Sequence, residues 1–178
     1  MGLKAGKVMF SSAEFYRTSS MQLPEREDLV EACKVEYEKK DHQINQLLWP
    51  NDGEPQFFVK FGVGIDRSEA HNQMYFHKMT AGSTVIRVPE VYWVFYEHTT
   101  GMTYMVMEYI RSHGDVSQIE MGRAIVELLS VRPPESAAPG PVGGGMLHHE
   151  LFRHRVANSV FKDNRDLGEY ITRVGHSS

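Results

Sequence analysis

The chain has little cysteine, no long apolar run and no excess of positive charge, and each absence excludes a class of protein. Its one cysteine, Cys33, excludes an internal disulfide and favours a reducing, cytoplasmic compartment. No stretch of about twenty apolar residues is present, so no membrane span is expected. Residues 1–7 are not followed by the apolar run of a signal peptide. The formal net charge of −4 provides no basic field for nucleic acid or an anionic membrane.

What is present is the composition of an ordinary globular protein. Hydrophobic residues make up 41% of the 178 residues and charged residues 24%, which is enough apolar material for a core. The length predicts one compact domain overall. We divide it into an N-terminal arm and helix at 1–54, a sheet with a helix at 55–110, and a helical remainder with a Pro/Gly-rich loop at 111–178.

Apolar periodicity and turn residues predict an α+β fold with an antiparallel sheet. Pro24, followed by Glu25, Glu27 and Asp28, indicates a helix start, and the apolar pattern extends this helix to Leu48. The other predicted elements, in chain order, are a strand at 56–62, a helix at 67–79, strands at 91–97 and 102–109 joined by a four-residue turn, and helices at 115–129, 147–156 and 163–173.

The strand at 56–62 carries a lysine among apolar residues. Phe58 and Lys60 are expected on one face of this strand. A lysine in such a position is costly unless a carboxylate pairs with it, and Glu69 on the next predicted helix is the first candidate. The pair has two interpretations of equal weight. Either it fixes the helix on the sheet, or the lysine lies in a cleft and binds or polarises an anionic or carbonyl group of a ligand.

Methionines and aromatic residues gather around this lysine in the sequence. The chain contains ten methionines, and several lie within the predicted helix and strands that follow Lys60. Ordinary core explains such a group, but methionine also suits deformable apolar pockets. We therefore take the following residues as candidate ligand contacts beside the candidate catalytic residues Lys60 and Glu69: Phe58, Met74, Met105, Met107 and Tyr109.

The sequence gives no reason to expect a metal or another cofactor. His148, His149 and Glu150 are followed by His154, but the five-residue step from His149 to His154 does not place two ligands on one helix face. A solvated polar segment is the simpler interpretation.

Several motifs occur in an order that resembles one known family, the aminoglycoside phosphotransferase/choline kinase-like proteins common in fungi. The motifs are Val59-Lys60-Phe61-Gly62, Glu69, Val88-Pro89-Glu90-Val91-Tyr92, Met107-Glu108-Tyr109-Ile110, Pro139-Gly140-Pro141-Val142-Gly143-Gly144-Gly145, and Asn164-Arg165-Asp166-Leu167-Gly168-Glu169-Tyr170. The resemblance implies a kinase-like N-lobe in which Lys60 pairs with Glu69, a hinge at Met107 to Ile110, and then the first helices of a C-lobe.

The same resemblance argues against phosphotransferase activity. Phosphoryl transfer requires a catalytic aspartate, a metal-holding asparagine and a second metal-holding aspartate. In the family these begin with His-Gly-Asp, followed by asparagine five residues after the aspartate. Here His113-Gly114-Asp115 comes directly after the hinge, and position 120 is Glu120. The interpretation is a truncated kinase-like chain without its catalytic loop.

Three functions remain open. In the first, the former nucleotide crevice binds an apolar small molecule and, in a catalytic form, acts as a cofactor-independent cyclase or isomerase in fungal secondary metabolism. In the second, the chain is a non-catalytic, pseudokinase-like module that binds a protein. In the third, it is a truncated product without activity. Apolar surface that a C-lobe would cover favours a homodimer over a monomer.

Overall fold

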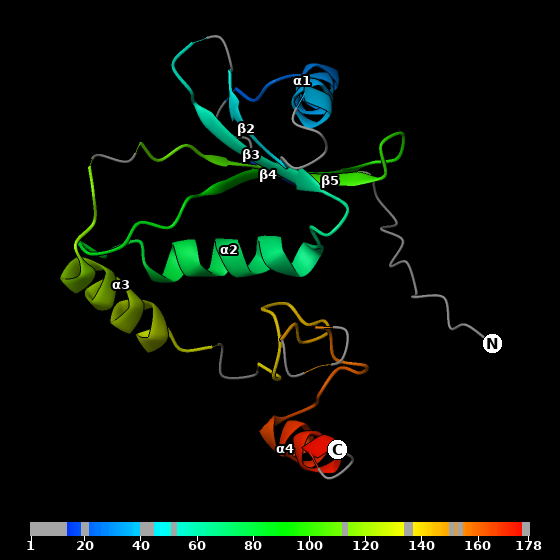
Figure 1. Ribbon diagram of the computed structural model, residues 1–178, viewed down its shortest axis with the longest axis vertical. Helices are drawn as coiled ribbons and strands as arrows, with labels where there is room; N and C mark the ends of the chain where they lie inside the picture. Colours follow the sequence, from blue (N-terminus) through cyan, green and yellow to red (C-terminus); the bar gives the residue numbers. More distant parts are fainter. Residues whose placement is uncertain are drawn as a thin grey trace. The chain divides into compact units, whose positions relative to one another are not determined.

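The computed structural model describes residues 14–18, 22–39, 45–50, 53–111, 114–133, 137–149, 152 and 155–175. These residues form an α+β fold (Figure 1). The elements, in chain order, are β1 (Glu14–Arg17), α1 (Arg26–Lys39), β2 (Gln46–Trp49), β3 (Phe57–Gly62), α2 (Arg67–Met79), β4 (Val91–Glu97), β5 (Met102–Glu108), α3 (Gln118–Ser130) and α4 (Asn164–Gly175).

The chain divides into two compact units. The first unit comprises Met1–Asp66 and Val91–Ile110, and contains the sheet and α1. The second comprises Arg67–Glu90 and Arg111–Ser178, and contains α2, α3 and α4. The chain therefore leaves the first unit after β3, returns to it for the hairpin of β4 and β5, and leaves again.

The sheet has the strand order β1-β4-β5-β3-β2, and every neighbouring pair is antiparallel. The predicted antiparallel α+β fold is thus confirmed. The turn between β4 and β5 lies where the sequence predicts it. Gly101 adopts a φ of 68° there, and the Glu97 carboxylate accepts hydrogen bonds from the backbone N–H and the hydroxyl of Thr99, at 3.0 and 2.9 Å.

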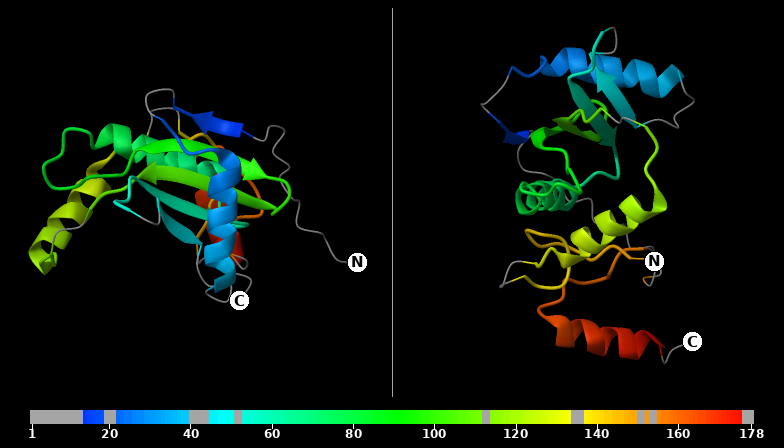
Figure 2. Two further views of the ribbon diagram at one scale, coloured as in Figure 1. Left: turned by 90° about the horizontal axis from the view of Figure 1, so that it is seen from above. Right: turned by 90° about the vertical axis from the view of Figure 1, so that its left-hand side faces the viewer.

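The main core lies between one face of the sheet and α1, which crosses that face (Figure 1, Figure 2). Residues in β3 alternate as predicted, because Phe57, Val59 and Phe61 are buried and Phe58 and Lys60 are half-buried. The core consists of Leu23, Leu29, Cys33, Leu47, Phe57, Val59, Phe61, Trp93, Phe95, Tyr104 and Val106.

A row of aromatic rings forms the centre of this core. The ring centroids of Trp93 and Phe95 are 4.4 Å apart, those of Phe95 and Tyr104 are 5.0 Å apart, and those of Tyr104 and Phe61 are 5.8 Å apart. Tyr37 of α1 meets Phe61 edge-on at 6.3 Å. Such offset and edge-on pairs add to the free energy of burying the rings, so this row contributes strongly to the stability of the unit.

The start of α1 is attached to the β4–β5 hairpin by one arginine. The Arg26 guanidinium donates to the Tyr96 carbonyl at 2.7 Å, pairs with the Glu97 carboxylate at 3.0 Å, and lies 4.8 Å from the centre of the Phe95 ring. The pKa of Glu97 is lowered, first by the N–H of Thr99 and further by Arg26. Glu97 is therefore ionised at neutral pH and holds both the turn and the helix.

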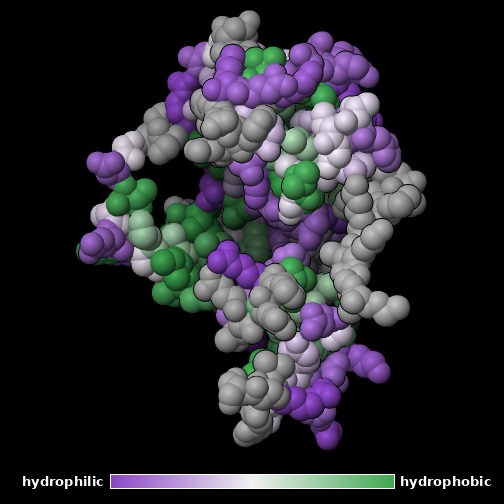
Figure 3. Space-filling view, turned by 45° about the vertical axis from the view of Figure 1, so that its right-hand side comes forward, coloured by the Kyte–Doolittle hydropathy of each residue, from purple (hydrophilic) through white to green (hydrophobic). Residues whose placement is uncertain are grey.

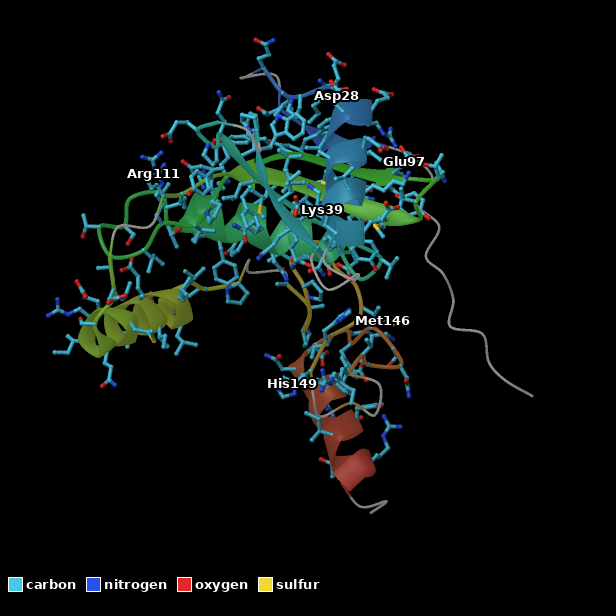
Figure 4. All side chains as sticks on the ribbon, turned by 45° about the horizontal axis from the view of Figure 1, so that its top comes forward. Asp28, Lys39, Glu97, Arg111, Met146 and His149 are labelled. Atoms are coloured by element: carbon cyan, nitrogen blue, oxygen red, sulfur yellow. The ribbon has the colours of Figure 1, made fainter. Side chains whose placement is uncertain are left out.

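One face of α1 is fully buried. Leu29 and Cys33 are 0% exposed, whereas Asp28 and Lys39, near the two ends of the helix, are exposed (Figure 4). Burial raises the pKa of the Cys33 thiol to about 12. Because the thiolate is the reactive form, Cys33 is inert core at neutral pH.

Two predicted helical segments have other structures. The predicted first helix continues to Leu48, but α1 ends at Lys39 and Gln46–Trp49 form strand β2. The physical reason is a change of period: Leu47 is 7% exposed and Leu48 38%, the alternation of a strand. The predicted helix at 147–156 is also wrong, because His148 and Val156 form an isolated antiparallel bridge.

The second unit has a small core of its own. Phe152, Ala157 and Phe161 are buried, and Leu167 and Tyr170 of α4 pack against them. The predicted helix at 163–173 is confirmed as α4. Its first backbone N–H groups, those of residues 165 and 166, donate to the Asp163 carboxylate at 2.9 Å, as at a helix N-cap.

Helix α2, found at its predicted position, holds several loops of the second unit. The Gln73 amide donates to the Pro89 carbonyl at 2.9 Å, and the His77 Nδ1–H to the Val88 carbonyl at 2.8 Å. The Tyr75 hydroxyl donates to the carbonyl of residue 132, which follows α3. These bonds join α2 to segments that lie far from one another along the chain.

Residues 139–145, which we call the glycine loop, are also bound by α2. The Val142 N–H donates to the Asn72 side chain at 2.7 Å, and the Gly144 N–H donates to the Pro141 carbonyl at 3.0 Å. Gly143 lies so close to α2 that a Cβ atom there would be 2.2 Å from Nδ1 of His71. The long Pro/Gly-rich loop predicted from the sequence is therefore held in a defined conformation.

Candidate functional site

The sheet face opposite α1 carries the predicted lysine. Lys60 of β3 is the register partner of Gln46 on β2 and of Met105 on β5, and Phe58 is the register partner of Met107. Directly opposite residues of antiparallel strands share one face, so these side chains are neighbours. We call this surface the lysine face, and define it by Gln46, Leu48, Phe58, Lys60, Val94, Met105 and Met107.

The lysine face changes from apolar to polar across the sheet. Met105 and Met107 of the central strand are 2% and 6% exposed. Phe58 and Lys60 on the next strand are half-buried, and Gln46 on the edge strand is exposed. Among the seven residues that define the face, Lys60 carries the charge. Lys60 therefore lies between a buried methionine on one neighbouring strand and an exposed glutamine on the other.

The accessible residues of this face are Gln46, Leu48, Phe58 and Lys60, and they can contact an apolar body and one electron-rich oxygen at the same time. Met105 and Met107 are buried, and their flexible, polarizable side chains allow the packing next to Phe58 and Lys60 to adapt. The ammonium group donates up to three hydrogen bonds and attracts an anion or polarises a carbonyl. The Gln46 amide, directly opposite on the neighbouring strand, offers a further donor and acceptor.

Sequence reasoning missed Gln46 because it assigned that residue to a helix. The segment Gln46-Leu47-Leu48-Trp49 was too short to show a clear period of two. The signal that identifies it is the turn-forming sequence Asn51-Asp52-Gly53, which is followed closely by strand β3. A strand, a turn and a second strand predict a hairpin, and the partner of Lys60 follows from that register.

The structure brings together four of the predicted site residues, Phe58, Lys60, Met105 and Met107, as two cross-strand pairs. Tyr109 directly follows β5 in the same unit and is half-buried. Glu69 and Met74 are half-buried residues of α2 and belong to the second unit. The ion pair between Lys60 and Glu69 therefore stays a prediction.

The histidine-rich segment that the sequence offers as possible metal ligands is only partly described. Glu150 and His154 lie outside the described residues, and so does His113. Across the described ranges of the chain, His, Cys, Asp and Glu side chains form no group of three that could hold a metal ion. In those same ranges, no helix has the length and apolar character needed to cross a bilayer.

Comparison with known proteins gives no match to a family model, to a curated protein or to a solved structure. The α+β fold with its antiparallel sheet is established by the strand register itself. The resemblance to kinase-like phosphotransferases rests on the order of the sequence motifs.

Proposed function

We propose that the chain is a kinase-like module whose lysine face binds a small molecule. The order of elements supports the kinase-like part: a lysine strand, a helix, a hairpin of two strands and then the segment Met107 to Ile110. The sheet also supports it, because the lysine strand β3 lies between the edge strand β2 and the second hairpin strand β5. The ligand proposal does not depend on the family, since it follows from the side chains of the face.

The observation that carries the proposal is the cross-strand pair of Lys60 and Met105. In this pair the half-buried Lys60 lies directly opposite the buried Met105, and Phe58 and Met107 form the adjacent pair. The ligand class that matches this surface has an apolar body and one carboxylate, enolate or carbonyl oxygen. The apolar body would contact the half-buried Phe58 side chain and the exposed Leu48 side chain opposite it, and the oxygen would accept a hydrogen bond from Lys60.

The same contact defines what a reaction at this site would use. A cofactor-independent cyclisation or isomerisation often passes through a developing negative charge on an oxygen. The Lys60 ammonium would stabilise that charge, and the apolar floor would strengthen the interaction by lowering the local dielectric constant. Phosphoryl transfer needs metal-holding acids at fixed spacing, and the motif at His113 to Asp115 does not supply them.

Replacing Lys60 by methionine is expected to abolish selectivity for an anionic ligand. A hydrogen bond to a charged group contributes about 1.5–3 kcal/mol, so a suitable carboxylate should bind roughly 10- to 150-fold more weakly to the variant. Calorimetric titration with 2-naphthoic acid and with its neutral amide measures this effect. The wild type should prefer the acid, and the variant should bind both compounds with similar, weak affinity.

A matched control separates the lysine face from general loss of positive charge. Lys34 is an exposed residue of α1, with its ammonium group 3.9 Å from the Glu31 carboxylate. Lys34→Met removes the same charge from the first unit and should leave binding of the acid unchanged. The proposal is wrong if Lys60→Met keeps the wild-type preference for the acid. It is equally wrong if ATP with Mg²⁺ stabilises the protein in a thermal melt and apolar acids do not.

A further inference from the structure

Helix α3 presents a wide apolar face. None of its side chains is buried. Figure 3 shows that hydrophobic residues (green) reach the molecular surface beside hydrophilic ones (purple). The large apolar residues of α3 exposed in this way are Ile119, Met121, Ile125, Val126, Leu128 and Leu129. At about 100° per residue they cover roughly half of the helix surface, and the charged residues lie on the other half. In Figure 4 the side chains of α3 extend outward around the whole helix.

A seam with the spacing of a helix–helix contact runs along this face. Ile119, Gly122, Val126 and Leu129 follow one another at steps of three, four and three residues, the repeat of paired helices. Leu129 is 81% exposed, whereas Gly122 has no side chain and a Cβ atom added there would meet nothing within 4 Å. The seam thus has a large projecting side chain near one end and a gap near its middle.

An open hollow accompanies this gap. It has a volume of about 430 Å³ and is lined by Gly122, Arg123, Val126, Glu127 and Ser130. Arg123 and Glu127 lie one turn apart on the same flank of the seam. The hollow therefore combines an apolar floor with one positive and one negative side chain.

We propose that this seam pairs with the same seam of a second copy of the chain, with the two α3 helices antiparallel. A twofold axis near Ile125 brings residues whose numbers sum to 250 to the same height along the two helices. Leu129 of one copy then lies level with Met121 and Gly122 of the other and enters the gap. The two Val126 side chains pack against each other across the axis.

The charges agree with this register. A twofold axis perpendicular to the helices keeps the same flanks together, so Arg123 of one copy faces Glu127 of the other, and the pair forms twice. Self-pairing of this kind requires one positive and one negative residue at equal distances from the axis. Arg123 and Glu127 satisfy that requirement about Ile125, which is the charge complementarity that identifies a second copy as the partner.

A lipid surface is a poorer partner for α3. Helices that lie on anionic membranes carry several lysines or arginines on their polar face. The polar face of α3 instead carries Glu120, Glu127 and Arg123. The pKa of Glu120 is lowered by its hydrogen bonds to Ser117, so this carboxylate is ionised at neutral pH. An anionic membrane would therefore repel this face.

The proposal is independent of ligand binding at the lysine face. A single helix pair is a small interface compared with the ~1,200–2,000 Å² of stable complexes. The dimer should therefore be weak and depend on concentration. Analytical ultracentrifugation of the whole chain, from low micromolar to near millimolar concentration, should show a rise from monomer toward dimer mass.

Charge reversal tests the register. Arg123→Glu places two carboxylates opposite each other twice, and Glu127→Arg does the same with two guanidinium groups. Each variant alone should associate at least about tenfold more weakly than the wild type. A mixture of the two variants restores an opposite pair at both positions, so it should associate about as strongly as the wild type. Lys162→Glu, a charge reversal at an exposed site outside α3, should associate like the wild type.

Three outcomes would overturn the proposal. The first is a wild-type chain that stays monomeric over the whole concentration range. The second is association that neither charge reversal weakens. The third is a mixture that associates no better than the separate variants, since antiparallel twofold pairing requires the rescue. Circular dichroism of each variant shows that the helical content is retained, so weaker association cannot be attributed to unfolding.

Discussion

Replacement of Phe95 by alanine is expected to lower the free energy of unfolding of the first unit by about 3–5 kcal/mol. Phe95 is 0% exposed and lies between Trp93 and Tyr104 in the aromatic row. Its removal leaves a cavity that the two remaining rings cannot fill, and it also takes away the surface on which the Arg26 guanidinium rests. Because domains are stable by only about 5–15 kcal/mol, this loss should bring the unit close to unfolding.

Urea denaturation followed by tryptophan fluorescence measures this effect. Phe95→Leu keeps most of the volume and should cost about half as much or less. Val63→Ala, at a position that is 82% exposed, should change the free energy of unfolding by less than about 0.5 kcal/mol. A loss below about 1 kcal/mol for Phe95→Ala would show that the aromatic row does not form the core of the sheet.

The second large effect is expected in the glycine loop, where two adjacent glycines provide a matched pair. Gly143 and Gly144 have φ angles of 87° and 86°, so alanine is strained to the same degree at both positions, by about 1 kcal/mol or more. They differ in their surroundings. A Cβ atom at Gly143 would lie 2.2 Å from Nδ1 of His71, whereas one at Gly144 would meet nothing within 4 Å.

Gly143→Ala should therefore destabilise the second unit by about 1–3 kcal/mol more than Gly144→Ala does. Thermal denaturation measures the difference, and hydrogen exchange at Val142 reports whether the loop has left α2. In a His71→Ala background the obstructing ring is absent, and the two glycine variants should become equivalent. Equal losses for both variants in the presence of His71 would contradict the close approach of the loop to the helix.

Local signals were sufficient for much of the fold. Each of these signals lies within about a dozen residues. The alternation in β3 and the apolar spacing of α2 are periods that the sequence shows directly, and the turn that contains Gly101 is recognised from its residue types. Strand β2 was not predicted, because four residues do not establish a period. In addition, the helical spacing that begins at Leu29 and Cys33 continues by chance to Leu48. The bridge between His148 and Val156 was not predicted for a related reason, because a single residue pair leaves no periodic pattern in the sequence.

Part of the candidate site could be predicted from local patterns, and the rest depends on contacts between distant segments. Phe58 and Lys60 share a face by strand alternation, and Met105 and Met107 do so on β5, so both pairs were visible in the sequence. Their register against each other depends on hydrogen bonds between distant strands, which no local pattern encodes. The close approach of Gly143 to His71 could not be predicted either, because these residues are distant in the sequence. The glycine alone indicated an unusual backbone conformation.

The most direct test of the lysine face observes the methionine methyl groups while a ligand is added. With ¹³C-labelled methionine methyls, titration with 2-naphthoic acid should shift the NMR signals of Met105 and Met107. The signals of Met121 and Met146, which are 53% and 45% exposed in the second unit, should remain in place. Single Met→Leu variants assign the signals. Shifts at Met121 or Met146, with Met105 and Met107 unchanged, would contradict the assignment of ligand binding to the face around Lys60.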